Sequence, residues 1–309
     1  MHCPQQYLDL GNESRPNDDE RNDPASRRRL DARLFHVPSP SISVAMSLFL
    51  RGTYWCALSR ENIVEKSSRK ELRQRRYSYA VVFAILAITL LVAAFRIDDI
   101  LIRILLIWSS LSLARLSVAY FRRNAAVFGK GADGSLAPLA VVVMLPFLLL
   151  TWGVWYLQNL VVRLPACNQI TPTLFLGRRC GPSALPPSTM AIIDVTAEFP
   201  TPRRLRKEFQ VIAIPILDGC APTWEECLRI HEHLQALGNP VAFVHCANGH
   251  GRSVTVMAVL LGLFDMTKSA DEALKIIRIS RSAIGPNADQ RAFLDAAFRK
   301  LGNRPEGAS

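Results

Sequence analysis

A cysteine and an arginine stand six positions apart in the segment Val244 to Ser253, with two glycines between them. The apolar run at 240–244 precedes this segment and predicts a short buried strand, while the run at 254–264 predicts a buried helix. A tight loop between a strand and a helix N-terminus binds anions well, because backbone N–H groups converge there and the helix dipole adds partial positive charge. The pattern therefore predicts a binding site for an anion such as phosphate.

Cys246 and Arg252 have complementary chemistry in such a loop. The planar guanidinium of Arg252 can hold two oxygens of a phosphate, and the same positive field stabilises a thiolate at Cys246. Gly249 and Gly251 permit backbone turns that a Cβ would forbid. A thiolate beneath a bound phosphate predicts attack on phosphorus with a phosphocysteine intermediate. The competing interpretation is a buried structural cysteine beside a helix start, which a lone cysteine would favour.

A phosphocysteine reaction also needs an acid for the leaving oxygen and then a base for water. Asp218 is the best candidate, because it follows a predicted strand on a Gly/Pro loop and precedes Cys246 by 28 residues. We expect that loop to be mobile. The alternative for Asp218 is a turn-forming role before Gly219. Asp194 also ends a predicted strand, and we interpret it as structural.

The sequence His-Cys-x-x-Gly-x-x-Arg-Ser resembles the signature of the cysteine-dependent protein tyrosine phosphatases, and its flanks are most similar to the dual-specificity branch. The resemblance covers residues 170–301. It implies that Cys246 is the nucleophile and that Arg252 binds phosphate and the transition state. It also implies that Ser253 helps the sulfur to leave, that His245 supports the thiolate from behind, and that Asp218 lies on the general-acid loop. The implied phosphate-binding residues are Ala247, Asn248, Gly249, His250, Gly251 and Arg252.

The resemblance also sets expectations for the substrate. Phosphorylated proteins are the leading class, and neither a metal nor a cofactor is expected. Dual-specificity enzymes that act on inositol lipids often carry lysines in this loop, but Ala247 and His250 occupy the matching positions here. The loop itself therefore does not favour a lipid phosphate, which stays an alternative. The second alternative is an inactive phosphate-binding scaffold.

From residue 163 to residue 309 the composition predicts a globular α/β phosphatase domain. Short β-branched runs predict buried strands, at 173–177, 191–195 and 211–216. Capping boxes at Thr223 and Ser269 predict helices that end near 237 and 279, and a last helix is expected over 288–301. Strands that alternate with helices predict a central, mostly parallel sheet flanked by helices, with the Cys246 loop at the carboxyl end of a central strand.

Long apolar stretches precede this domain. Residues 77–95 and 134–162 carry no charge, and 104–121 carries only Arg115. As helices they are long enough for a hydrocarbon core of about 30 Å. The sequence therefore predicts transmembrane helices, at about 77–95, 104–121 and 136–160. Trp152 and Trp155 are typical of an interfacial belt, and no polar face at helical spacing favours a soluble core.

Residues 1–76 are polar and broken by prolines, which predicts disorder, and they end in a basic cluster from Lys66 to Arg76. Met46 is an alternative start. The positive-inside rule places the basic cluster in the cytoplasm, and three crossings would then leave the phosphatase domain outside. Thiol chemistry and seven cysteines without a CxxC pair favour the reducing inside instead. The sequence predicts a multi-pass membrane protein and leaves the side of its catalytic domain open.

The charge distribution bears on other partners. The net charge is +11, from 37 Lys and Arg against 26 Asp and Glu. This excess is spread along the chain, and no segment is a uniformly basic domain with interleaved aromatic residues. Nucleic-acid binding is therefore not expected. The expected partners are the bilayer and a phosphorylated protein or lipid phosphate.

Overall fold

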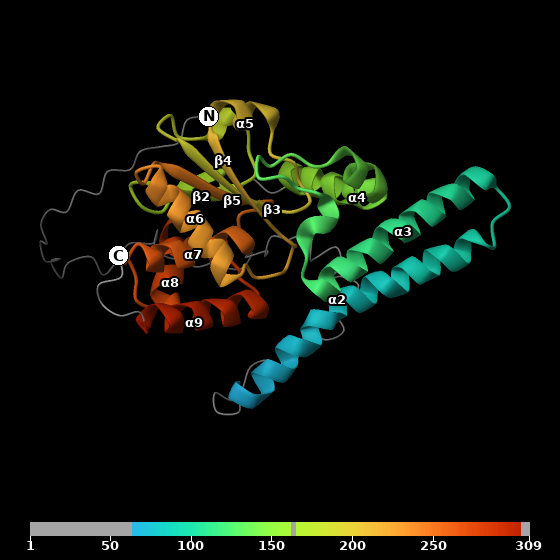
Figure 1. The fold of residues 1–309 in the computed structure, drawn as a ribbon, viewed down its shortest axis with the longest axis horizontal. Helices are drawn as coiled ribbons and strands as arrows, with labels where there is room; N and C mark the ends of the chain where they lie inside the picture. Colours follow the sequence, from blue (N-terminus) through green and yellow to red (C-terminus); the bar gives the residue numbers. More distant parts are fainter. Residues whose placement is uncertain (1–63, 162–164, 304–309) are drawn as a thin grey trace, which may run out of the picture.

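The computed structural model describes residues 64–161 and 165–303 (Figure 1). Three long helices come first: α2 (Val64–Ala94), α3 (Ile100–Arg122) and α4 (Pro138–Val161), with the 3-10 helix η4 (Ala125–Phe128) before α4. The predicted apolar helices are therefore confirmed as helices. By length and composition each is compatible with membrane association. The predictions for residues 1–63 lie outside the described residues.

The start of α2 differs from the prediction. Disorder was expected up to residue 76, but α2 begins at Val64. Residues 65–74 are rich in Glu, Lys, Arg and Gln, which are strong helix formers. Extending an existing helix requires no new nucleus. The helix formed by the apolar segment therefore extends toward the N-terminus through the charged residues that precede it. The basic cluster from Lys66 to Arg76 is thus part of α2.

A five-stranded sheet forms the centre of the rest of the chain. Its strands are β1 (Cys167–Gln169), β2 (Leu174–Arg178), β3 (Ala191–Thr196), β4 (Gln210–Ile216) and β5 (Ala242–Cys246). Their order is β1-β2-β5-β3-β4, and only β1 is antiparallel to its neighbour. The expected mostly parallel sheet is confirmed, and the strand before the Cys246 loop is central, as predicted.

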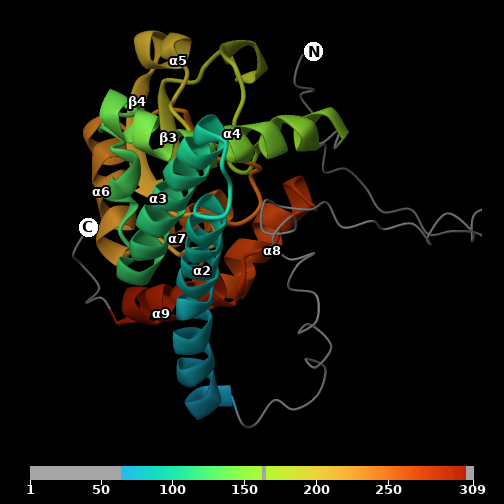
Figure 2. The ribbon, with the colours of Figure 1, turned by 90° about the vertical axis from the view of Figure 1, so that its right-hand side faces the viewer.

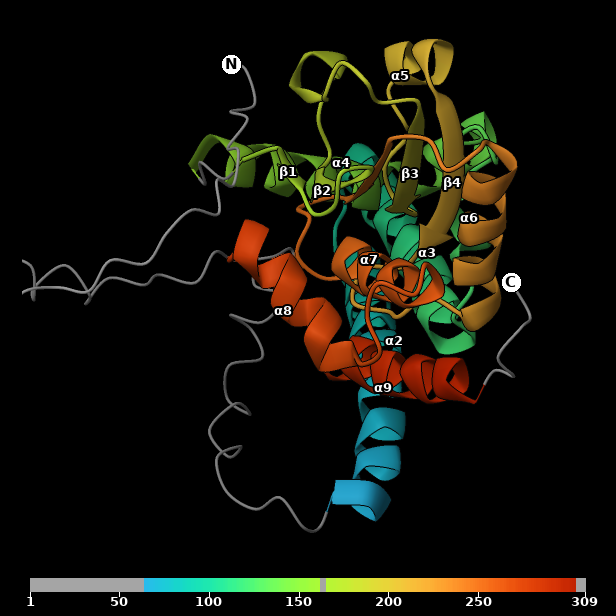
Figure 3. The same cartoon turned by 90° about the vertical axis from the view of Figure 1, so that its left-hand side faces the viewer.

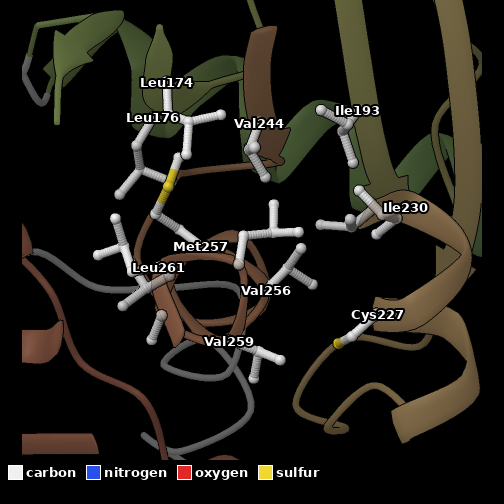
Figure 4. Close-up of a cluster of buried hydrophobic side chains, with 14 of the residues drawn as sticks. Leu174, Leu176, Ile193, Cys227, Ile230, Val244, Val256, Met257, Val259 and Leu261 are labelled. Atoms are coloured by element: carbon white, nitrogen blue, oxygen red, sulfur yellow. The ribbon is translucent and has the colours of Figure 1, made fainter. Parts of the chain in front are cut away.

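Helices cover both faces of this sheet (Figures 1 and 3). One side holds α6 (Trp224–Ala236), α7 (Arg252–Leu263), α8 (Ala270–Ser280) and α9 (Ala288–Gly302), and the other holds the short helices η5 (Pro182–Ala184) and α5 (Arg203–Glu208). Val256 and Met257 of α7 point toward Leu176 and Val244 of the sheet (Figure 4). Because α7 is buried along its whole length, the loop between β5 and α7 is fixed at both ends.

The three apolar helices form a further layer. Helices α2 and α3 make a hairpin that extends away from the sheet (Figure 1), and α4 runs across that hairpin (Figure 2). A buried cluster joins Phe83, Leu116 and Met144 of these helices to Ala197 and Leu217. The last two residues follow the carboxyl ends of β3 and β4. The apolar helices therefore pack on the edge of the sheet where ligand sites of parallel sheets lie.

Candidate active site

Cys246 is the last residue of β5, and α7 begins at Arg252. The thiol of Cys246 is buried. The Gly249 N–H group donates to its Sγ atom at 3.2 Å, and the Ser253 hydroxyl donates at 3.3 Å. Two donors therefore converge on one sulfur. The Ser253 hydroxyl lies close enough to the Cys246 sulfur to stabilise it as a leaving group.

The carbonyl groups of the loop are bound from outside. The Ala247 oxygen accepts a hydrogen bond from Trp155 Nε1 of α4 at 3.0 Å. The oxygens of Asn248 and Gly249 accept from the Arg281 guanidinium at 3.0 and 2.9 Å. A peptide whose carbonyl is held outward turns its N–H inward, which is the arrangement of an anion-binding nest. Arg281 and Trp155 thus shape the loop without being part of it.

The two glycines of the loop are required for different reasons. Gly249 has φ +73°, and a Cβ there would lie 2.5 Å from the backbone of Gly177 on β2. Gly251 has φ −115°, which any residue can adopt. A Cβ on Gly251 would instead meet the Gln290 side chain at 2.9 Å. The predicted need for an unusual turn is confirmed at Gly249, whereas Gly251 permits close packing of α9.

Arg252 is buried and engaged by two carboxylates. Its two Nη atoms donate to Glu198 at 2.8 and 2.7 Å, and one also donates to the Ile216 carbonyl at 2.9 Å. The Asp218 carboxylate lies 3.1 Å from Nη2. The bidentate contact with Glu198 fixes the plane of the guanidinium. Glu198 therefore holds the group that the resemblance assigns to phosphate binding.

Asp218 lies on the predicted loop after β4, and its side chain is 36% exposed. Its crowded surroundings still raise its pKa, mainly through desolvation, and the charge of Glu198 adds to this effect while Arg252 opposes it. A carboxyl group with a raised pKa keeps its proton closer to neutral pH, as a general acid requires.

The loop that carries Asp218 was expected to be mobile, but three side chains hold it. Tyr120 of α3 donates its hydroxyl to the Asp218 carbonyl at 3.0 Å. At the start of α9, the N-cap residue Asn287 donates to the Gly219 carbonyl at 2.7 Å, and Gln290 donates to the Cys220 carbonyl at 3.1 Å. In this structure the apolar helices thus contact both the catalytic loop and the loop of the candidate acid.

Asp194 faces a lysine from the segment between η4 and α4. Lys130 Nζ lies 2.8 Å from its Oδ2, and both side chains are fully buried. The Thr201 hydroxyl also donates to Asp194 at 2.6 Å. Burial by itself raises the pKa of Asp194, but the charge of Lys130, the neighbouring His245 and hydrogen bonds from Lys130 and Thr196 together hold that pKa below its ordinary value. A permanently charged, fully paired carboxylate fits the structural role interpreted from the sequence.

The two histidines of the signature are less engaged. The His245 ring stacks on Phe243 with centroids 5.4 Å apart, and its Nδ1 lies 3.3 Å from the Cys246 carbonyl oxygen. Burial lowers the pKa of His245, so the ring is neutral near pH 7. Burial and the nearby Arg281 lower the pKa of His250 to about 4. Neither ring therefore adds positive charge to the site at neutral pH.

Four residues of this arrangement were not found from the sequence: Tyr120, Lys130, Trp155 and Glu198. Three of them come from the apolar half of the chain, where Trp155 was assigned to an interfacial belt and the other two were not singled out. Glu198 stands in the short segment after β3 and was not singled out either. Its signal was its position, because an acid just past the carboxyl end of a buried strand faces the same edge as the Cys246 loop.

The fold and the Cys246 loop are compatible with a phosphatase domain of the cysteine-dependent type, over about a third of the chain. Residues 189–293 match the family described as "PTP-SAK: Swiss Army Knife protein, DSP-PTPase phosphatase domain". This part of the chain therefore carries a phosphatase domain of the dual-specificity and tyrosine-phosphatase type. No match was found among the curated proteins.

Solved structures show similar arrangements over part of the chain. Human DUSP28 is 18% identical with a TM-score of 0.41, over 45% of this chain and 97% of that one. Tk-PTP in its active form is 22% identical with a TM-score of 0.37, over 46% and 99%. PTPMT1 in complex with PI(5)P is 21% identical with a TM-score of 0.40, over 44% and 97%. Each likeness covers less than half of this chain.

Proposed function

We propose that the protein is a membrane-associated phosphomonoesterase that works through a phosphocysteine. Cys246 attacks phosphorus, and the bond to the leaving oxygen breaks. The loop N–H groups and Arg252 stabilise the equatorial oxygens. Asp218 gives its proton to the leaving oxygen and then takes one from the water that hydrolyses the phosphocysteine. Ser253 donates to the sulfur as it leaves.

The observation that carries this proposal is the position of the Cys246 sulfur. It accepts from two donors at 3.2 and 3.3 Å, at the end of a buried strand. The Arg252–Asp218 ion pair, at 3.1 Å, stands beside the loop. A phosphate dianion competes with Asp218 for Arg252, because the guanidinium can bind either group. Asp218 released from Arg252 loses the contact that lowers its pKa, and it takes up from water the proton that it later donates. Glu198 holds Arg252 in place during this exchange, and the displaced acid stays next to the leaving oxygen.

The membrane side of the proposal concerns the substrate. Trp155 of α4 contacts the catalytic loop and Tyr120 of α3 contacts the acid loop. Helices with an exposed apolar surface are thus attached to both functional loops. This favours a substrate presented at a bilayer, either a phosphorylated membrane protein or a lipid phosphate, since a tethered site gains effective concentration for such substrates.

The test uses the full chain in nanodiscs. Phosphate release is measured on phosphotyrosine and phosphoserine peptides, phosphatidylglycerophosphate and phosphoinositides, with Cys246→Ser as the matched control. We expect turnover on at least one substrate, and in the variant loss of turnover with vanadate binding retained. Residual activity above a few per cent in Cys246→Ser would exclude the cysteine mechanism. Vanadate binding by a wild-type chain that hydrolyses none of these substrates would identify the inactive scaffold.

A further inference from the structure

Helix α4 is attached to the catalytic unit at both of its ends. Just before it, the Gly134 carbonyl accepts from the Thr201 N–H at 2.8 Å. Near its end, the Gln158 side chain accepts from Asn248 of the catalytic loop at 3.1 Å. A helix that crossed a hydrocarbon core of about 30 Å would place these two ends on opposite sides of the bilayer. One folded unit contacts both ends, so α4 does not cross.

The tryptophans of α4 agree with this arrangement. They were expected to form a belt in the lipid headgroups. Instead Trp152 donates to the Glu198 carbonyl at 2.9 Å and Trp155 donates to the Ala247 carbonyl at 3.0 Å. Both indoles therefore face the active site. The side of α4 that carries Met144 and Leu148 is likewise buried.

The opposite side of α4 is exposed and apolar. It presents these residues: Leu139, Val142, Leu149, Leu150, Tyr156, Leu157, Leu160 and Val161. Near the start of α4, Trp108 of α3 donates to the Val142 carbonyl at 3.1 Å, so this surface continues onto the hairpin. A continuous apolar surface of this extent marks a membrane or protein contact. A helix that is apolar all round is buried in protein or in lipid, and α4 buries one side on the catalytic unit, so its other side fits hydrocarbon.

Helices α2 and α3 contact the catalytic unit only near their base. Tyr120 reaches Asp218, and Arg123 pairs with Asp289 of α9 at 2.6 Å. Farther from the catalytic unit, the two helices form hydrogen bonds with each other. The Ser110 hydroxyl of α3 donates to the Ala87 carbonyl of α2 at 2.7 Å. Their outward sides are apolar and exposed over residues 77–95 and 100–121. Hydrocarbon is therefore the natural surrounding of this hairpin.

The tip of the hairpin carries charge. Arg96, Asp98 and Asp99 are exposed there, and each would be costly in the hydrocarbon core. A hairpin that ended inside the bilayer would bury them, whereas one that crosses returns them to water. Arg115 lies two turns from the base and can extend its head group toward it. A hairpin that crosses twice also leaves the catalytic unit on the side of the basic cluster at 66–76.

We propose that α2 and α3 cross the bilayer as a hairpin and that α4 does not cross but packs between the catalytic unit and the hairpin with its outer side in lipid. The catalytic loop then stays on the side of the basic cluster, which the positive-inside rule assigns to the cytoplasm. This removes the conflict between three crossings and a thiol that needs a reducing compartment. The arrangement stands whether or not the loop hydrolyses phosphate.

The test maps two points of the full chain in the inner membrane of a bacterial host. The first is the C-terminus, fused either to a green fluorescent protein, which fluoresces in the cytoplasm, or to alkaline phosphatase, which is active only outside. The second is the hairpin tip, where Asp98→Cys is labelled in intact spheroplasts with a membrane-impermeant maleimide. The unmodified chain corrects for labelling of its own cysteines, and a Cys placed at Glu208 of α5 is the matched control.

We expect a fluorescent C-terminus, a tip that is labelled from outside and a control cysteine that is labelled only after lysis. An active alkaline phosphatase fusion together with a labelled tip would show that α4 crosses, which overturns the proposal. A fluorescent C-terminus with an unlabelled tip would show that the hairpin does not cross, which also overturns it. Release of the chain from membranes by alkaline carbonate would assign the apolar surface to a protein partner instead.

Discussion

Glu198 and Arg252 form a buried bidentate ion pair, with Nη to Oε distances of 2.8 and 2.7 Å. Glu198 acts through Arg252 and is therefore a positioning residue. We expect Glu198→Gln to lower kcat/KM about 10- to 100-fold, which corresponds to about 1.5–3 kcal/mol for a hydrogen bond to a charged group. Glu208→Gln, on the exposed end of α5, is the control and should have no effect.

The pH profile separates this role from a general loss of structure. The charge of Glu198 contributes to the raised pKa of Asp218, so removing it lowers that pKa. A general acid must be protonated, and activity falls as pH rises through its pKa. The basic limb of the kcat profile should therefore move to lower pH in Glu198→Gln. A reduced kcat with the basic limb of the pH profile unchanged would assign Glu198 a merely structural role.

Asp218→Asn tests the acid itself. The amide cannot protonate a leaving oxygen, so kcat should fall strongly, by about 100-fold or more, on alkyl phosphates. An activated aryl phosphate needs little protonation and should lose much less. Steady-state kinetics on the two substrate types measure the difference. Equal losses on both would move the acid role to another group, and Asp194, which is buried and paired with Lys130, would not be that group.

Lys130→Met tests the attachment of the apolar half to the sheet. Removing one partner of a buried ion pair costs about 3–5 kcal/mol, because the other charge is left without compensation. The full chain in nanodiscs should therefore melt at a clearly lower temperature. Adding Asp194→Asn removes the stranded charge and should recover part of the loss.

The matched control for that pair is Arg206→Met. Arg206 pairs with Asp133 at 2.8 Å, but the Asp133 side chain is 58% exposed. Exposed pairs contribute about 0–1 kcal/mol, so this variant should melt almost as the wild type does. Comparable losses in Lys130→Met and Arg206→Met would contradict the distinction between the buried and exposed pairs.

Tyr120→Phe tests whether the hairpin holds the acid loop. The variant loses only the hydroxyl that donates to the Asp218 carbonyl. A hydrogen bond of this kind contributes about 0.5–1.5 kcal/mol, so kcat on alkyl phosphates should fall about threefold to tenfold, with KM little changed. Tyr77→Phe, on the exposed side of the hairpin, is the control. A change in KM without a change in kcat would argue against this role.

The sequence predicted the catalytic half of the fold well, because each signal there was local. β-branched runs preceded turns at β3 and β4. A capping box at Thr223 begins α6, whereas Ser269 caps α8 without the reciprocal bond, because Glu272 accepts from the Lys268 N–H group instead. The loop was found because Cys246, Gly249 and Arg252 stand together in the chain. The observed Sγ contacts with Gly249 and Ser253 are consistent with that expectation, while the catalytic roles remain predictions.

The arrangement of the apolar half was not predictable in the same way. Hydropathy measures transfer from water and does not distinguish lipid from a protein core. Helix α4 buries one side against the catalytic unit and exposes the other, and both sides are apolar, so no polar face marked it as a helix that packs. The contacts of Lys130 and Trp155 join residues 64 and 92 positions apart, to Asp194 and Ala247, and no local pattern encodes such pairs.

The buried Lys130–Asp194 pair has a consequence for biogenesis. The chain is made from its N-terminus, so α2, α3 and Lys130 emerge before β3. In the proposed topology, insertion of the hairpin therefore precedes completion of the sheet. Asp194 then meets a counter-charge that is already anchored. A chain that fails to insert lacks a properly placed Lys130, Trp155 and Tyr120 when its catalytic loop forms. In the proposed topology, formation of the catalytic loop is thereby coupled to delivery of the chain to the membrane.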